Sequence, residues 1–221
     1  MKVAGLFVIA TVLTLHAGSE PGSVIGPVFR VDFTNPGLSP PHWTLTIRPD
    51  GSGHFSSERG TAPTVGEPEI EAPSVDRDIR LSQGFAEHIF QTAHHHKWSG
   101  GDCESHMKVA FQGWKKLSYD GPEGQGICEF NYSKDKDIQA LGDSLVSVAT
   151  TIVEGAKLES LLQHDRLGLD QEMQFLAEAA GDGRAQQICT IRGILERLSE
   201  DDGVMERVKK RARMLLVRAE E

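Results

Sequence analysis

Positive charge is scarce in this sequence of 221 residues, in which 23 lysines and arginines stand against 32 aspartates and glutamates, a formal net charge of -9. Proteins that bind DNA or RNA neutralise phosphates with clustered Lys and Arg side chains. The acidic balance therefore argues against nucleic-acid binding, and we expect no nucleic-acid partner. Only the C-terminal stretch is locally basic.

Motifs that signal catalysis or cofactor binding are also missing. The chain has no G-x-S-x-G nucleophile elbow, no phosphate-binding loop, no dinucleotide fingerprint and no CxxC pair. We therefore predict no cofactor, and the sequence favours a protein that is not an enzyme.

Long apolar runs are confined to the N-terminus, which reads MKVAGLFVIATVLTLHAGSEPGS. Lys2 precedes an apolar run of about 13 residues, shorter than the ~20 that a membrane-spanning helix needs. Ala17 and Ser19 place small residues where a signal peptidase cuts. The pattern predicts a signal peptide over residues 1–19, a secreted or periplasmic protein and no transmembrane segment after cleavage. An uncleaved anchor is the alternative.

Cysteine occurs at only three positions, Cys103, Cys128 and Cys189, so at least one thiol stays free of any intramolecular bridge. Cys103 and Cys128 form the expected pair because they flank the same strand region. In a simple meander they lie two strand spacings apart, roughly 9–10 Å, beyond the ~7 Å limit for bridged Cα atoms. The bridge then requires the SGGDCE loop to fold inward, and the sequence leaves it open.

Alternation with a period of two dominates the first part of the chain. It appears in the runs VFRVDFT, DRDIRLS, HMKVAFQ, GWKKLSYD and ICEFNY, and a hairpin around the turn PDGSG is predicted over residues 42–58. Ser82 is a plausible N-cap for a helix that ends near Lys97. These patterns predict an antiparallel sheet packed by one helix over residues 20–133.

From Asp135 onward the apolar period changes to about 3.6, which is typical of amphipathic helices. A long helix is expected to end near His164, and three shorter ones follow it. Residues 134–221 are thus predicted to form a region of about four helices. The fold class that follows is α+β, with a helical C-terminus.

The bend QTAHHHKWSGGDCESH, residues 91–106, raises the question of a metal or catalytic site. Three successive histidines on a helix point about 100° apart and cannot close around one ion, whereas metal-binding helices place histidines at i and i+4. Histidine at a helix C-terminus also interacts favourably with the dipole. We interpret the bend as architectural. The alternative is a metal-binding protein or hydrolase-like enzyme that uses His88, His95, Cys103 and His106.

The C-terminal stretch VMERVKKRARMLLVR predicts a basic amphipathic helix. Its polar flank carries Arg207, Lys210, Arg211 and Arg218. A helix docked through its apolar stripe explains this pattern. Peripheral membrane contact through residues 204–218, or an acidic partner, is the other interpretation.

Three stretches, WTLTIRPDGSGHFSSE, LSQGFAEHIFQTAHHHKW and VAFQGWKKLSYDG, resemble a group of secreted bacterial α+β proteins of unknown function. The resemblance covers residues 40–135. It implies a hairpin, then a helix that ends in an aromatic residue, then further strands, and it implies no activity. Taken together, the sequence predicts an exported, non-enzymatic binding or structural module of the cell envelope or exterior, with an unidentified protein partner.

Overall fold

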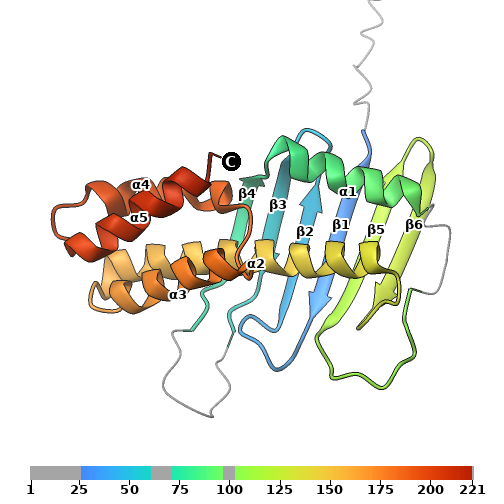
Figure 1. Ribbon diagram of the computed structural model, residues 1–221, viewed down its shortest axis with the longest axis horizontal. Helices are drawn as coiled ribbons and strands as arrows, with labels where there is room; N and C mark the ends of the chain where they lie inside the picture. The colour runs from blue at the N-terminus through green and yellow to red at the C-terminus, as the bar shows by residue number, and fades with distance from the viewer. Residues whose placement is uncertain (1–25, 61–70, 97–102, 221) are drawn as a thin grey trace, which may run out of the picture.

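The structure is a computed structural model that describes residues 26–60, 71–96 and 103–220 (Figure 1). The predicted signal peptide over residues 1–19 lies outside these ranges. Among the helices that the structure describes, none is long and apolar enough to cross a membrane.

Six strands form one antiparallel sheet in the order β4-β3-β2-β1-β5-β6 (Figure 1). The strands are β1 (Val28–Thr34), β2 (His42–Ile47), β3 (Ser52–Ser57), β4 (Val75–Arg80), β5 (Trp114–Gly121) and β6 (Gly124–Phe130). The helices are α1 (Gln83–His95), α2 (Lys136–His164), α3 (Leu169–Asp182), the 3-10 helix η1 (Ile188–Ile191), α4 (Arg192–Glu200) and α5 (Glu206–Arg218). The predicted α+β class with a helical C-terminus is confirmed.

Alternation along the strands gives the sheet two different faces. One face is apolar and buried, and its side chains include Phe29, Val31, Phe33, Trp43, Leu45, Phe55, Leu117 and Phe130. Figure 1 shows α1 and α2 crossing this face. The other face carries the polar members of each strand, such as Arg30, Asp32 and Lys116, and stays open to solvent.

Helix α2 takes part in two hydrophobic cores. The sheet core includes α2 residues as far as Ala156, and the core shared with α3, α4 and α5 begins at Leu158. The helix has 29 residues, about 44 Å at 1.5 Å per residue, whereas six strands span only about 24 Å. Its second half therefore overhangs the sheet and carries the helical region. Two helices cover the sheet, whereas the sequence predicts one. The two hydrophobic cores meet near residue 157, whereas the sequence predicts a domain boundary at residue 134.

One predicted strand is wrong. Residues 106–112, the run HMKVAFQ, form no strand, and Met107 and Phe111 are 53% and 57% exposed. The predicted meander placed this run beside β5, but β5 already pairs with β1 on one edge and with β6 on the other. Alternation alone does not make a strand when no edge is available to pair with it.

Helix α5 docks as its apolar stripe predicts, with Val208, Ala212 and Leu215 buried in the helical core. Two of its predicted basic residues bind one carboxylate, Asp170 Oδ1 in the first turn of α3, with Arg207 Nε at 2.7 Å and Arg211 Nη1 at 2.6 Å. Hydrogen bonds from Arg211 and Arg207 lower the pKa of Asp170. The other two, Lys210 and Arg218, are exposed.

Candidate functional site

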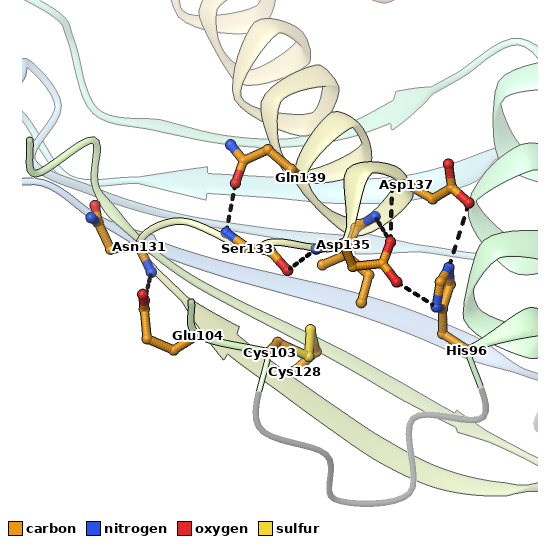
Figure 2. Close-up of a disulfide and its surroundings, with 10 residues drawn as sticks. His96, Cys103, Glu104, Cys128, Asn131, Ser133, Asp135, Asp137 and Gln139 are labelled. Carbon is orange, nitrogen blue, oxygen red and sulfur yellow. Dashed lines mark hydrogen bonds and ion pairs between the residues drawn. A yellow bond between two sulfur atoms is a disulfide. The ribbon is translucent and has the colours of Figure 1, made fainter. Parts of the chain in front are cut away.

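The Cys103–Cys128 disulfide, which the sequence leaves open, is present with a Cα–Cα distance of 5.4 Å (Figure 2). Cys128 lies on the buried side of β6, and the chain after Cys103 runs along the end of that strand. Ser105 N–H donates to Tyr132 O at 2.8 Å, and Asn131 N–H donates to Glu104 Oε2 at 2.6 Å. The sequence overestimated the Cys–Cys separation because it inserted a strand at residues 106–112.

The three successive histidines point to three different surroundings, as the helical spacing predicts. His94 Nδ1 forms an ion pair with Glu123, and the ring of His95 meets the ring of His96 edge-on at 5.2 Å. His96 is the C-cap of α1 and turns toward the start of α2 (Figure 2).

The alternative metal set of His88, His95, Cys103 and His106 does not come together in residues 26–60, 71–96 and 103–220. The sulfur of Cys103 is bonded to Cys128. His88 and His95 are exposed on α1, and His106 is exposed with a left-handed backbone φ of 54°.

A different group, His96, Asp135 and Asp137, is the one set of closely spaced metal-ligand atoms in the described chain, all within 4.8 Å of one another. Asp135 is the N-cap of α2, and its Oδ1 accepts the N–H groups of Asp137 and Ile138 at 3.0 and 3.2 Å. Its Oδ2 lies 3.3 Å from His96 Nδ1. Asp137 Oδ2 lies 3.9 Å from His96 Nε2. The sequence missed this group because its members belong to two helices far apart in the chain.

The position of this group favours a structural role, in which it joins two helix ends, over metal binding. The positive end of a helix dipole stabilises carboxylates and opposes a further cation, and the N-cap bonds already use one oxygen of Asp135. The contact of His96 Nδ1 with Asp135 joins the end of α1 to the start of α2, while the buried His96 Nε2 has no hydrogen-bond partner among the described residues.

A hollow of about 330 Å³ lies on the open face of the sheet. Its residues belong to three neighbouring strands, with hydroxyls from Thr44, Thr46 and Ser118 and charges from Arg30, Asp32 and Lys116. In the sheet register, Arg30 lies between Thr46 and Ser118, and Asp32 lies between Thr44 and Lys116. The sequence does not reveal this hollow, because lateral neighbours appear only when the strand order is known.

The charged side chains of this hollow differ in whether they have a hydrogen-bond or ion-pair partner. Lys116 Nζ bonds Glu129 Oε1 at 2.8 Å, which raises the pKa of Lys116. Asp32 Oδ1 lies 3.1 Å from His42 Nε2. The guanidinium of Arg30 has no hydrogen bond or ion pair with any described residue. Arg30 is therefore available to an anion from outside.

A larger hollow of about 590 Å³ lies where the start of α1 meets η1 and the end of α5. It includes the free thiol of Cys189 and the predicted surface residue Arg218. Burial raises the pKa of Cys189, so the thiol is a poor nucleophile near neutral pH.

No protein-family model matches the chain, and no curated protein matches its sequence. The case for a function therefore rests on the geometry of these sites.

Proposed function

We propose that the protein is an exported binding module that holds a small polar ligand with one anionic group on the open face of its sheet. The observation that supports this best is the hollow of about 330 Å³ in which the unpaired Arg30 stands beside three hydroxyls. Pockets that bind drug-sized ligands begin at about 300 Å³.

The chemistry of the hollow suits an acidic sugar. A guanidinium binds a carboxylate with two parallel hydrogen bonds. Each hydroxyl of Thr44, Thr46 and Ser118 both donates and accepts, which matches the hydroxyl groups of a sugar ring. A sugar acid such as glucuronate carries both features.

Two features support export. The N-terminal sequence has the layout of a secretory signal, and disulfides such as Cys103–Cys128 persist in oxidising compartments outside the cytosol.

Replacing Arg30 with methionine should weaken glucuronate binding by about tenfold or more, since a hydrogen bond to a charged group contributes about 1.5–3 kcal/mol. Isothermal titration calorimetry measures the affinity. Arg48→Met is the matched control, because Arg48 is also exposed but lies outside the hollow. Glucose tests the need for the anionic group. Equal binding of glucose, or equal binding by the Arg30→Met variant, would contradict the proposal.

The competing hypothesis is metal binding at His96, Asp135 and Asp137, whose ligand atoms are closely spaced. The helix dipole and the existing bonds oppose it, so we expect well under one equivalent of zinc to remain after incubation and gel filtration. Elemental analysis measures the number of zinc equivalents that remain bound. A full equivalent that disappears in His96→Ala, and persists in the control His88→Ala, would establish the metal site instead.

A further inference from the structure

A third hollow lies on the other side of the sheet, between the loop that follows β1 and the middle of α2. Its volume is about 120 Å³. Most of its lining residues are apolar in type, although polar atoms also line the wall, and they include two aromatic rings, Phe33 and Trp43, which stack with their centroids 5.0 Å apart. One ionisable residue lines it, Glu154 of α2.

Glu154 belongs to a buried cluster of three charged side chains. Glu154, Lys157 and Glu172 are 4%, 4% and 7% exposed. Lys157 Nζ lies 2.9 Å from Glu154 Oε1 and 3.4 Å from Glu172 Oε1. A single ammonium group thus serves two carboxylates.

The second oxygen of Glu154 has no donor. Its Oε2 is buried and makes no hydrogen bond with any residue that the structure describes. A buried carboxylate oxygen without a partner costs several kcal/mol. Either a proton on Glu154 or a cation in the hollow beside it removes this cost.

We propose that the hollow binds a small organic ammonium ion, whose charge pairs with Glu154 Oε2 and whose alkyl groups contact Phe33 and Trp43. Aromatic faces attract ammonium groups when the site excludes water. An apolar cavity of about 150 Å³ holds benzene, so a hollow of about 120 Å³ accommodates about five non-hydrogen atoms. With the ligand in place, the ammonium group supplies a positive charge beside the second oxygen of Glu154, while Lys157 Nζ lies beside the first.

Proton release should accompany binding. Burial first, and then the neighbouring Glu172, raise the pKa of Glu154 well above its ordinary value. Glu154 therefore keeps its proton to a higher pH than an ordinary glutamate, and this proton can be shared with Glu172, while Lys157 opposes the shift. The described residues that line the hollow from β1, β2 and the loop between them carry no charge. The incoming ammonium ion displaces the proton of Glu154 into solvent, so affinity rises with pH.

The experiment uses the full chain and tert-butylammonium chloride as the probe, with tert-butanol as an uncharged molecule of the same shape. Calorimetry in two buffers of different protonation enthalpy measures both affinity and proton release. We expect saturable binding of the cation, release of up to one proton, and affinity that increases by at most tenfold per pH unit. Absence of binding to the folded protein, or equal binding of tert-butanol, would overturn the proposal.

Variants test whether the ammonium ion binds in the hollow rather than elsewhere on the surface. Glu154→Gln keeps the shape of the neutral acid and should fold, but it should lose at least tenfold in affinity and all proton release. Thr150→Phe, at the half-buried wall of the hollow, should block binding without any change in charge. Glu178→Gln is the matched control, because it removes an exposed carboxylate of α3. Binding that survives Glu154→Gln unchanged would refute the assignment, whatever the outcome with glucuronate.

Discussion

Replacing Lys157 with methionine will destabilise the protein by about 3–5 kcal/mol near neutral pH, because Glu154 and Glu172 then stay buried without their shared cation. Urea unfolding followed by circular dichroism measures the change in the free energy of unfolding. Lys210→Met, on the exposed side of α5, is the control and should stay within about 0.5 kcal/mol of the parent protein.

The pH dependence of that loss follows from the raised pKa of Glu154. Below the ordinary value of 4.5 the carboxyl is protonated in both the folded and the unfolded chain, so it carries no penalty. Between the ordinary pKa and the raised pKa of the folded state, the folded chain holds the proton of Glu154 more tightly than the unfolded chain does. The free energy of unfolding therefore falls as the pH rises through this range, by at most about 1.4 kcal/mol per pH unit for one group.

The Lys157→Met penalty should therefore grow with pH, and adding Glu154→Gln should recover much of it. A loss below about 1 kcal/mol, or one that does not change with pH, would mean that water reaches the cluster.

Removing the disulfide should cost about 3 kcal/mol, the second large effect. The bridge joins residues 25 apart, and closing a loop of that size restricts the unfolded chain by about this amount. The expected result is a lower urea midpoint for the Cys103→Ala, Cys128→Ala double variant and for the reduced parent protein.

Cys189→Ala controls for loss of a thiol that is not bridged, and it should shift stability by less than about 1 kcal/mol. If reduction left the midpoint unchanged, the hydrogen bonds that Glu104 Oε2 accepts from the N–H groups of Asn131 and Tyr132 would be sufficient to hold the segment on β6.

Elements with purely local signals were predictable from the sequence. The hairpin over residues 42–58 was predictable, because its turn residues and the alternation of Trp43 and Leu45 all lie within one stretch. Helix α1 was also predictable, because Ser82 is its N-cap as expected and accepts a hydrogen bond from the N–H of Phe85 at 3.4 Å. The 106–112 run failed because a strand needs a free neighbouring edge, which no local pattern reveals.

The candidate sites were less predictable because each depends on distant contacts. Glu154 and Lys157 look like a surface ion pair along a helix, and only the packing of α3 buries them with Glu172. Arg30 comes to lie between Thr46 and Ser118 only in the strand order β2-β1-β5. The divergence of the histidines was predictable, since it follows from helix geometry alone.

The central claim is that the open face of the sheet is the ligand-binding surface, and amide chemical shifts recorded during a glucuronate titration test it most directly. The predicted result is a set of saturable shifts confined to β1, β2 and β5 around Arg30, Thr46 and Ser118. Shifts that concentrate instead around His96 and Asp135, or no shifts at all, would contradict it.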